Sequence, residues 1–477
     1  MSGSPWQRVA WQKNMATLAK IPPEWILPEA VLEEAAAMRH ITGPFIRKLL
    51  NEEEVTITEA PTAQLIGYIR TRQYSAKEVA AAYCKEPHSP ISWLNNCLHE
   101  IFFQDEIEQA VNLDRQLKET GEFAGPMHGV PVSLKDQFHV KYAAETSMGY
   151  VSWVGTFEGA QGTGRGFHDQ SQLVEELHSL GAVLYCKTSC PQTLLLGETV
   201  NNLIGRTMNP VNQLLSCGGS SGGEGALLAL GASNTCKNAS DYCWRGIGGS
   251  VRIPAAYCGT RSIKPSCGRF SYRTVANSVI EWEPPSHEEA LALHDIILDI
   301  DGGDDVWRQL SILHEPVIPQ VSERFGNGPK DPVPTLELLD IVLKHKAYVA
   351  RYLEYWASTV KHTGTGRDVD AVILPVAPHA VVIPGEYFIT ASYTEFVNIL
   401  DFTSAVLPGT KADKNVDVAH GDFKPLTPND EVNWRAYNAD KYDGAPVCVQ
   451  LMGRKFEEER ILGIAMRVEE LLKKLTK

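Results

Sequence analysis

The sequence predicts an α/β fold in which helices cover both faces of a central β-sheet. Amphipathic helical segments alternate along the chain with short strands that are apolar on both faces, and such strands are typical of sheets buried on both sides. Hydrophobic residues make up 43% of the 477 residues, enough for a large buried core. The length allows either about two to three ordinary domains or one large α/β domain with insertions.

The first elements in the chain are predicted to be helices. The stretch up to about Glu54 is rich in Glu, Ala and Trp and is expected to form helices that wrap a larger body. Ser75 is expected to cap the next helix, with Glu78 completing a capping box. Residues 170–188 (QSQLVEELHSLGAVLYCKT) combine a helical apolar stripe, a capping Gly181 and a buried strand.

The later elements repeat this alternation. Buried strands are predicted at 371–377 (AVILPVA) and 446–452 (PVCVQLM). The second strand leads into a C-terminal helix, and 407–435 is expected to be a polar surface excursion. One face of the C-terminal helix gathers its apolar residues, which are Ile461, Leu462, Ala465, Val468, Leu472 and Leu475.

Composition and charge exclude several function classes. The formal net charge of −14 argues against nucleic acid and anionic membrane surfaces as general partners. No stretch approaches the ~20 apolar residues that span a bilayer, and the N-terminus lacks the apolar segment of a secretory signal, so a cytoplasmic location is expected. The ten cysteines are then expected to be reduced thiols. Cys186 and Cys190 have no second pair of ligands nearby, so no metal site is predicted.

Residues 215–231 (LSCGGSSGGEGALLALG) place the adjacent Ser220 and Ser221 among six glycines, ahead of small helix-forming residues. Taken alone, this segment fits a flexible linker or turn as well as a catalytic loop. A phosphate-binding loop is a weaker alternative, because the Lys-Ser/Thr ending is missing and Glu224 stands where a phosphate would lie.

Two other segments favour the catalytic loop. GPMHGVPVSLKDQF places Lys135 shortly after a Gly-Val-Pro turn and directly before Asp136, and GIGGSVRIP places Ser250 after two glycines. A single lysine of this kind usually reaches solvent, and a single serine after two glycines usually lies in a turn. All three segments in this order along one chain are far more specific.

This order, Gly-x-Pro-x-x-x-Lys-Asp, then GGSSGGEGA, then Gly-Gly-Ser-Val-Arg-x-Pro, resembles the amidase signature family. Residues 182–210 are similar to the segment that precedes the family's serine loop, and residues 14–27 and 442–454 resemble fungal acetamidases. The resemblance extends over nearly the whole chain. It implies the amidase signature fold with a mixed central sheet, a helical region at 1–75 packed on an amidase domain at 76–477, and a catalytic core at 125–270.

The resemblance also implies amide hydrolysis by a Ser-Ser-Lys triad that uses no metal or cofactor. Ser250 would be the nucleophile, Ser220 a relay serine that follows a cis peptide bond, and Lys135 the base. A lysine accepts a proton only when it is neutral, and burial or nearby positive charge favours that form. Backbone N–H groups would form the oxyanion hole, contributed by Ile247, Gly248, Gly249 and Ser250.

Further residues follow from the same resemblance. Leu194 is expected to line the substrate pocket, while Gln192, Ser221 and Arg252 are expected to support the site. The expected partner is a small, acetamide-like carboxylic amide. Whether the chain forms a homodimer is a question that the resemblance leaves open. Fatty-amide or ester hydrolysis is an alternative that the length of the acyl pocket would decide. A role in tRNA-dependent transamidation fits less well, because the N-terminus is more similar to free-standing amidases.

Two departures from the family pattern bear on activity. Residues 234–246 are about six residues longer than the pattern between the serines, and Gly246 stands where the family keeps an Asp that orders Arg252; Asp241 is the candidate replacement. Near 279–282 the chain passes directly into a segment that resembles a much later part of the family, which predicts an internal deletion. Such a deletion would expose apolar faces worth ~25 cal/mol per Å², so the second hypothesis is a catalytically impaired or dead amidase-fold protein from a truncated or mis-spliced gene product.

Overall fold

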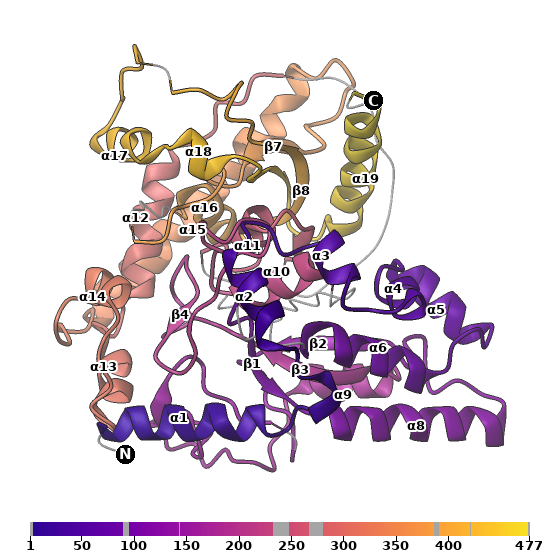
Figure 1. Cartoon of the computed structure of the whole chain (residues 1–477). Helices are drawn as coiled ribbons and strands as arrows, with labels where there is room; N and C mark the ends of the chain where they lie inside the picture. The colour runs from indigo at the N-terminus through magenta and orange to yellow at the C-terminus, as the bar shows by residue number, and fades with distance from the viewer. Residues whose placement is uncertain are drawn as a thin grey trace. The chain divides into compact units, whose positions relative to one another are not determined.

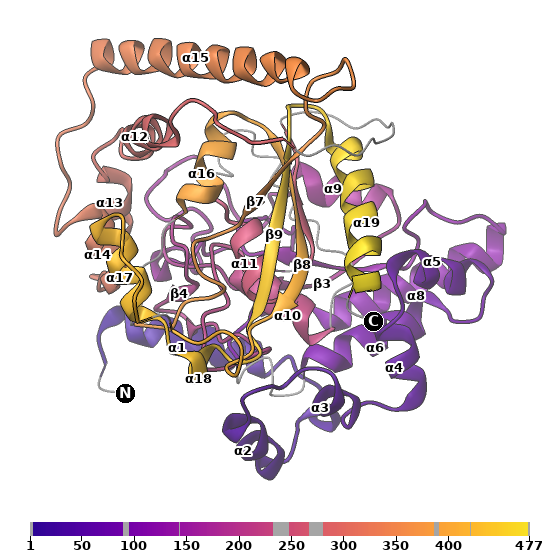
Figure 2. The same cartoon turned by 90° about the horizontal axis from the view of Figure 1, so that it is seen from above.

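The computed structural model (Figures 1 and 2) describes residues 3–88, 95–142, 144–231, 248–266, 280–385, 391–419 and 421–475. Its contacts divide the chain into two compact units. Unit 1 comprises Met1–Ala239 and Arg308–Val321, and unit 2 comprises Ser240–Trp307 and Ser322–Lys477. Both units combine helices with small sheets, which confirms the predicted α/β class. The predicted insert at 234–246 and residue 279 of the predicted gap lie outside the described residues.

Unit 1 is built on a three-stranded mixed sheet of order β1-β3-β2. Strand β3 (Val183–Thr188) pairs antiparallel with β1 (Leu98–Ile101) and parallel with β2 (Pro131–Lys135). Every residue of the three strands is buried, as predicted for β3. Helices α6 (Ala76–His88), α8 (Phe103–Thr120) and α10 (Gly222–Leu230) contact this sheet. Its register places Lys135, at the end of β2, opposite Thr188.

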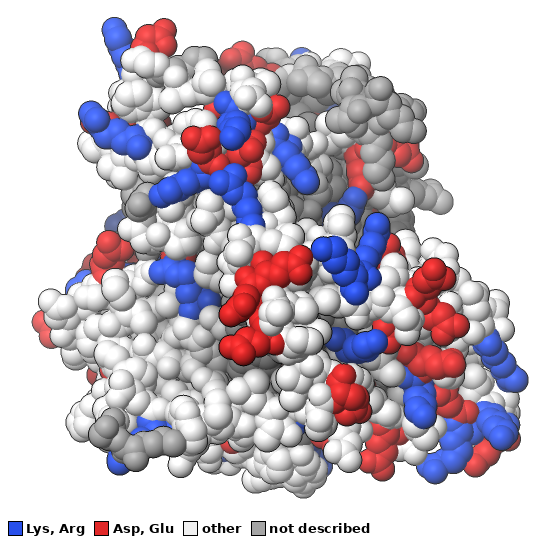
Figure 3. Space-filling view, viewed as in Figure 1, with Lys and Arg blue, Asp and Glu red and all other residues white. Residues whose placement is uncertain are grey.

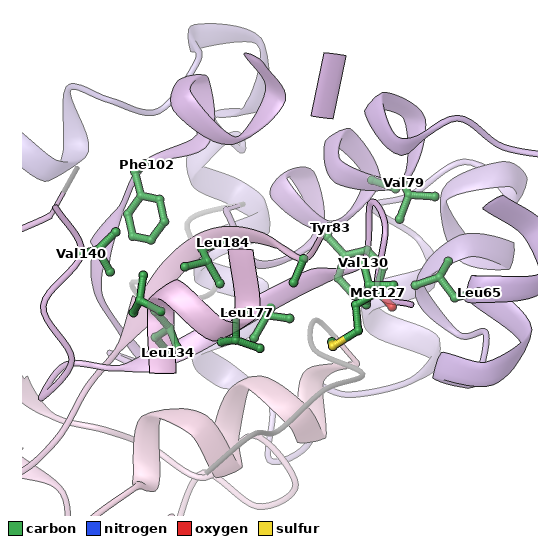
Figure 4. Close-up of a cluster of buried hydrophobic side chains, with 14 of the residues drawn as sticks. Leu65, Val79, Tyr83, Phe102, Met127, Val130, Leu134, Val140, Leu177 and Leu184 are labelled. Carbon is green, nitrogen blue, oxygen red and sulfur yellow. The ribbon is translucent and has the colours of Figure 1, made fainter. Parts of the chain in front are cut away.

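The main apolar core of unit 1 lies between this sheet and the helices that precede it. Figure 4 shows Leu65 beside Val79 and Met127, while Leu134, Leu177 and Leu184 come from β2, α9 (Gln172–Ser179) and β3. Ile57, Ala60, Leu65 and Ile69 belong to the same cluster, so helices of the N-terminal region bury side chains against the sheet. The other helices and strands of unit 1 are α1 (Pro5–Leu18), η1 (Pro23–Trp25), α2 (Glu29–Ala37), α3 (Pro44–Arg47), α4 (Glu52–Thr58), α5 (Thr62–Arg70), η2 (Val151–Trp153), β4 (Val200–Asn201) and β5 (Gly205–Arg206).

Local signals in the sequence set the ends of two helices of unit 1. The Ser75 backbone N–H donates to Glu78 Oε2 at 2.8 Å, and the Glu78 N–H donates to Ser75 Oγ at 3.2 Å, which confirms the capping box before α6. Helix α9 ends ahead of Gly181, whose φ of 83° is the left-handed conformation that favours glycine after a helix.

Unit 2 contains a four-stranded antiparallel sheet of order β6-β8-β9-β7. Its strands are β6 (Ser262–Lys264), β7 (Val372–Pro375), β8 (Thr403–Lys411) and β9 (Pro446–Gly453). Helix α19 (Glu458–Leu475) contacts β8 and β9 (Figure 2) through a buried face that includes Ile461 and Ala465. This face confirms the predicted amphipathic C-terminal helix.

Helices form the second layer of unit 2. Helix α12 (His287–Leu298) contacts α15 (Thr335–Ser358) and α16 (Ser392–Ile399) around an apolar cluster that includes Trp356 and Phe402. The remaining elements of unit 2 are α11 (Arg252–Tyr257), η3 (Thr359–Lys361), α17 (Pro428–Ala436) and α18 (Ala439–Tyr442). Helices α13 (Asp304–Ser311) and α14 (Pro319–Phe325) carry the chain into unit 1 and back again.

Two predictions about this sheet were wrong. The strand at 371–377 is not buried on both faces, because β7 lies at the edge of the sheet and Ile373 is 61% exposed. The segment 407–435 is not only a polar excursion, because β8 continues through it as far as Lys411 and α17 lies near its end. The residues from Thr403 to Leu407 are buried, so β8 is an inner strand that then runs out to solvent.

Charged side chains on helices α4 to α8 of unit 1 are mixed in sign. Figure 3 shows Lys and Arg interspersed with Asp and Glu over this part of the surface. Arg47 pairs with Glu59 at 2.5 Å, and Lys85 pairs with Glu54 at 2.8 Å. Two basic residues of this face, Arg47 of α3 and Lys85 of α6, therefore pair with acidic neighbours, and the mixed signs do not form the uniformly basic patch that attracts nucleic acid.

Candidate active site

Lys135 lies at the buried end of β2 and contacts the serine loop. Its side chain is 7% exposed, and its Nζ donates a hydrogen bond to Ser220 Oγ at 2.7 Å. Burial lowers the pKa of Lys135 from 10.5 to about 8, although the neighbouring Cys190, Asp136 and Glu224 act in the opposite direction. About a tenth of Lys135 is therefore neutral at pH 7 and roughly half at pH 8, and the neutral amine can accept a proton.

The serine loop is a packed element and not a flexible linker. Ser220 and Ser221 are 3% and 1% exposed, and the Gly219–Ser220 peptide bond is cis, as the resemblance implies. A Cβ on Gly223 would lie 2.4 Å from Ser189 N and 2.6 Å from Cys97 O. Glycine is required at this position because the backbone of the loop approaches the backbone of neighbouring segments too closely for any side chain.

Glu224 joins this loop to the sheet that carries Lys135. Its carboxylate is 2% exposed and accepts hydrogen bonds from Ser133 Oγ at 2.5 Å and from Thr188 Oγ1 at 2.9 Å. Ser133 lies on β2, and Thr188 is the residue opposite Lys135 on β3. From the sequence alone, Glu224 is only an argument against phosphate binding; its position as an acidic residue between the glycines of a loop was the signal for this structural role.

Asp136 anchors the backbone on the other side of Lys135. It is fully buried, lies 3.1 Å from Lys187 Nζ and 3.2 Å from His99 Nε2, and accepts from Ser147 Oγ at 2.7 Å. Although burial raises the pKa of this carboxyl group, His99, Lys187 and the Ser147 hydrogen bond outweigh it and hold the pKa well below its usual range. The resulting carboxylate fixes the strand end that presents Lys135.

The predicted pocket residues follow β3. Gln192 is completely buried, and its backbone N–H donates to Val200 O at 2.9 Å. Thr193 and Leu194 adopt the left-handed conformation, with φ values of 76° and 61°. Leu194 is half-buried, so its side chain is available to line a pocket. The Gln192 side chain is instead fully buried.

The predicted nucleophile segment belongs to unit 2. Ser250 is half-buried and lies two residues before the start of α11. Gly249 has a φ of 113°, and a Cβ there would lie 2.2 Å from Thr394 Oγ1, whose hydroxyl donates to Gly248 O at 2.5 Å. Ile247 lies outside the described residues. The approach of Ser250 to Ser220 stays a prediction.

Arg252 is completely buried in unit 2. It donates to Gln450 Oε1 at 2.9 Å, to Thr394 O at 2.8 Å and to Asn398 Oδ1. Burial lowers its pKa to about 9. Uncharged oxygen atoms therefore accept the hydrogen bonds that order the Arg252 guanidinium group. Asp241, the candidate replacement for the family's Asp, lies outside the described residues.

Within the described ranges, no group of three or more His, Cys, Asp or Glu side chains is placed to hold a metal ion. Cys186 and Cys190 are buried free thiols, and burial raises the pKa of both. No helix in the described part of the chain is long and apolar enough to cross a membrane.

Known proteins are similar to this chain in both sequence and fold. The amidase family model matches residues 78–278 and 276–462. The chain is 32% identical to an acetamidase of Emericella nidulans over an alignment of 566 positions, gaps included, that covers 98% of both proteins. It is 31% identical to an acetamidase of Aspergillus oryzae, covering 99% of this chain and all of the relative. A solved fatty acid amide hydrolase has a similar fold, with a TM-score of 0.85 at 22% identity over 98% of this chain and 95% of that one.

Proposed function

The chain belongs to the amidase family, and we propose that it hydrolyses a small carboxylic amide, such as acetamide, to the acid and ammonia. The observation that carries this proposal is the buried hydrogen bond of 2.7 Å between Lys135 Nζ and Ser220 Oγ. A lysine with a pKa of about 8 can take a proton from a serine near neutral pH. The similarity to two acetamidases over nearly their full length supports a small acyl group.

In the proposed acylation step, Ser250 Oγ bonds to the amide carbon while its proton passes to Ser220 Oγ and the Ser220 proton passes to neutral Lys135. The carbonyl electron pair moves onto oxygen, and the backbone N–H groups of 247–250 stabilise that charge. When the oxyanion collapses, the C–N bond breaks. The nitrogen takes a proton that returns from Lys135 through Ser220, and ammonia leaves.

Deacylation uses the same groups in the same order. Water attacks the acyl-serine ester while one of its protons passes through Ser220 to Lys135. The C–O bond to Ser250 then breaks, Ser250 recovers its proton through the relay, and the carboxylic acid is released. Each proton taken up by Lys135 is returned within the same half-reaction, so the cycle consumes only the amide and water.

We place this reaction in a reducing compartment, the cytoplasm. No disulfide joins the seven cysteines in the described part of the chain, and six of these cysteines are buried. Paired cysteines would be expected in an oxidising compartment.

Ammonia release from acetamide, measured on the purified chain, tests the proposal. We expect turnover by the wild type, loss of at least about 10³-fold in Ser250→Ala and Lys135→Met, and wild-type rates in Ser152→Ala. Ser152 is a useful control because it is a buried serine, 2% exposed, that takes no part in the proposed mechanism. Equal turnover by Ser250→Ala and wild type would overturn the assignment of the nucleophile. Hydrolysis of a long-chain amide or an ester without acetamide turnover would instead support the fatty-amide or ester alternative.

The second candidate function is an amidase-fold protein with impaired catalysis. It is supported by the family model, which matches the chain in two separate parts that meet at 276–278, next to the predicted deletion, and by an alignment with the Emericella acetamidase that is longer than this chain. A cooperatively folded chain that hydrolyses neither amides nor esters would favour this candidate.

A further inference from the structure

Glu315 is a buried carboxylate that the proposed mechanism does not use. It belongs to Arg308–Val321, the segment that leaves unit 2 to join unit 1, and it is 5% exposed. Three donors from separate parts of unit 1 surround it: the Val151 backbone N–H at 2.8 Å, Gln192 Nε2 at 2.5 Å and Asn202 Nδ2 at 3.1 Å. Burial raises its pKa, although these hydrogen bonds oppose the rise. A carboxylate with three donors at this depth fixes all three segments.

The contact with Gln192 fixes both ends of that side chain. Its Nε2 donates to Glu315, and its Oε1 accepts from the Ile318 backbone N–H at 3.3 Å. A Cβ on Gly149 would lie 2.3 Å from Pro191 O and 2.7 Å from Gln192 Cα, so the backbone behind Gln192 is packed as well. Gln192 therefore has one orientation, set by the segment that carries Glu315.

The two residues after Gln192 need this support. Thr193 and Leu194 have φ values of 76° and 61°, a conformation that is unfavourable for residues with a side chain and persists only where the surroundings enforce it. In the proposed function, Leu194 lines the acyl pocket. The shape of the pocket wall at Leu194 thus depends on how Gln192, the residue before Thr193, is held in place.

We propose that Glu315 is a positioning residue that determines acyl-group specificity, because it holds Gln192 and thereby the wall formed by Thr193 and Leu194. The inference rests on the proposed amidase function and deepens it. It assigns the discrimination between short and longer aliphatic amides to a contact that joins residues 123 positions apart in the chain.

The test compares kcat/KM for acetamide and hexanamide in four proteins. In Glu315→Gln, the new side-chain NH2 group faces N–H groups that donated to the carboxylate. Gln192 Nε2 thereby loses its strongest hydrogen-bond acceptor. The exchange Gln192→Glu with Glu315→Gln restores one donor and one acceptor across the contact. Asn202→Ala is the matched control, because it removes another hydrogen bond to Glu315 but leaves Gln192 in place. Thermal unfolding of each variant measures the general loss of stability.

We expect Glu315→Gln to reduce the acetamide-to-hexanamide preference by about three- to tenfold, the exchanged pair to recover most of it, and Asn202→Ala to retain it at a comparable unfolding temperature. Equal losses on both substrates in Glu315→Gln, without recovery in the exchanged pair, would overturn the inference and leave the amidase function intact. A wild type that folds but cleaves neither amide would overturn the proposed function, and the inference with it.

Discussion

Replacing Lys135 with methionine should remove activity and yet stabilise the folded protein. The native environment lowers the pKa of Lys135 from 10.5 to about 8 through burial. Below pH 8 the lysine is charged in both the folded and the unfolded chain, so folding bears the full cost of burying that charge. Between pH 8 and 10.5 only the unfolded chain holds the proton, so the cost falls as pH rises.

The size of the effect follows from the two pKa values. For Lys135 the cost is about 3 kcal/mol at pH 7, about 2 kcal/mol at pH 9 and below about 1 kcal/mol at pH 10. Lys135→Met also loses the hydrogen bond to Ser220, which contributes about 1 kcal/mol. The variant should therefore be more stable than the wild type by about 2 kcal/mol at pH 7, and this advantage should disappear near pH 10.

Urea unfolding of both proteins at pH 7, 9 and 10 measures this difference. Lys187→Met is the matched control, because Lys187 is equally buried but pairs with Asp136 at 3.1 Å. Removing Lys187 leaves Asp136 without its lysine partner, which should cost about 3–5 kcal/mol. The reasoning is refuted if Lys135→Met is destabilised like Lys187→Met, or if its advantage over the wild type does not change with pH.

Three further predictions concern the same loop and strand. Because Lys135 must be neutral to act as the base, and its pKa is about 8, kcat/KM for acetamide should rise about eightfold to tenfold between pH 7 and pH 9; a flat pH profile would contradict this role. Glu224 raises the pKa of Lys135, so Glu224→Gln should move the rising limb of that profile to lower pH, and a shift to higher pH would show that another effect dominates. Gly223→Ala should destabilise the protein by more than about 2 kcal/mol because its Cβ would lie 2.4 Å from Ser189 N, whereas Gly67→Ala, a helical position with open space around it, should stabilise it by up to about 1 kcal/mol. Differential scanning calorimetry measures both glycine variants, and equal effects would contradict the packing argument.

The sequence predicted the elements whose signals are local. The capping box at Ser75 and Glu78, the left-handed Gly181 and the amphipathic face of α19 each depend on residues within a few positions of one another. The buried contact between Lys135 and Ser220 was predicted only through the family motif, because no local pattern shows that residues 85 positions apart meet in the fold.

The missed features depend on tertiary structure. Glu224 reaches Ser133 and Thr188 only because β2 and β3 pair in one register, and no spacing in the sequence shows that pairing. The strand at 371–377 and β8 were misjudged for a related reason: apolar content predicts that a strand forms, but its place at the edge or centre of a sheet depends on which strands pair with it. The internal deletion near 279–282 stays a prediction.

The intact mass of the folded chain after reaction with a fluorophosphonate probe shows whether Lys135, Ser220 and Ser250 act together, and it needs no knowledge of the substrate. We expect one probe molecule to add to the wild type, and Ser250→Ala and Lys135→Met to remain unlabelled, since the first lacks the nucleophile and the second lacks the base. A wild type that unfolds cooperatively but gains no mass, or a Ser250→Ala variant that is labelled as fully as the wild type, would contradict the claim that Lys135, Ser220 and Ser250 form one catalytic site.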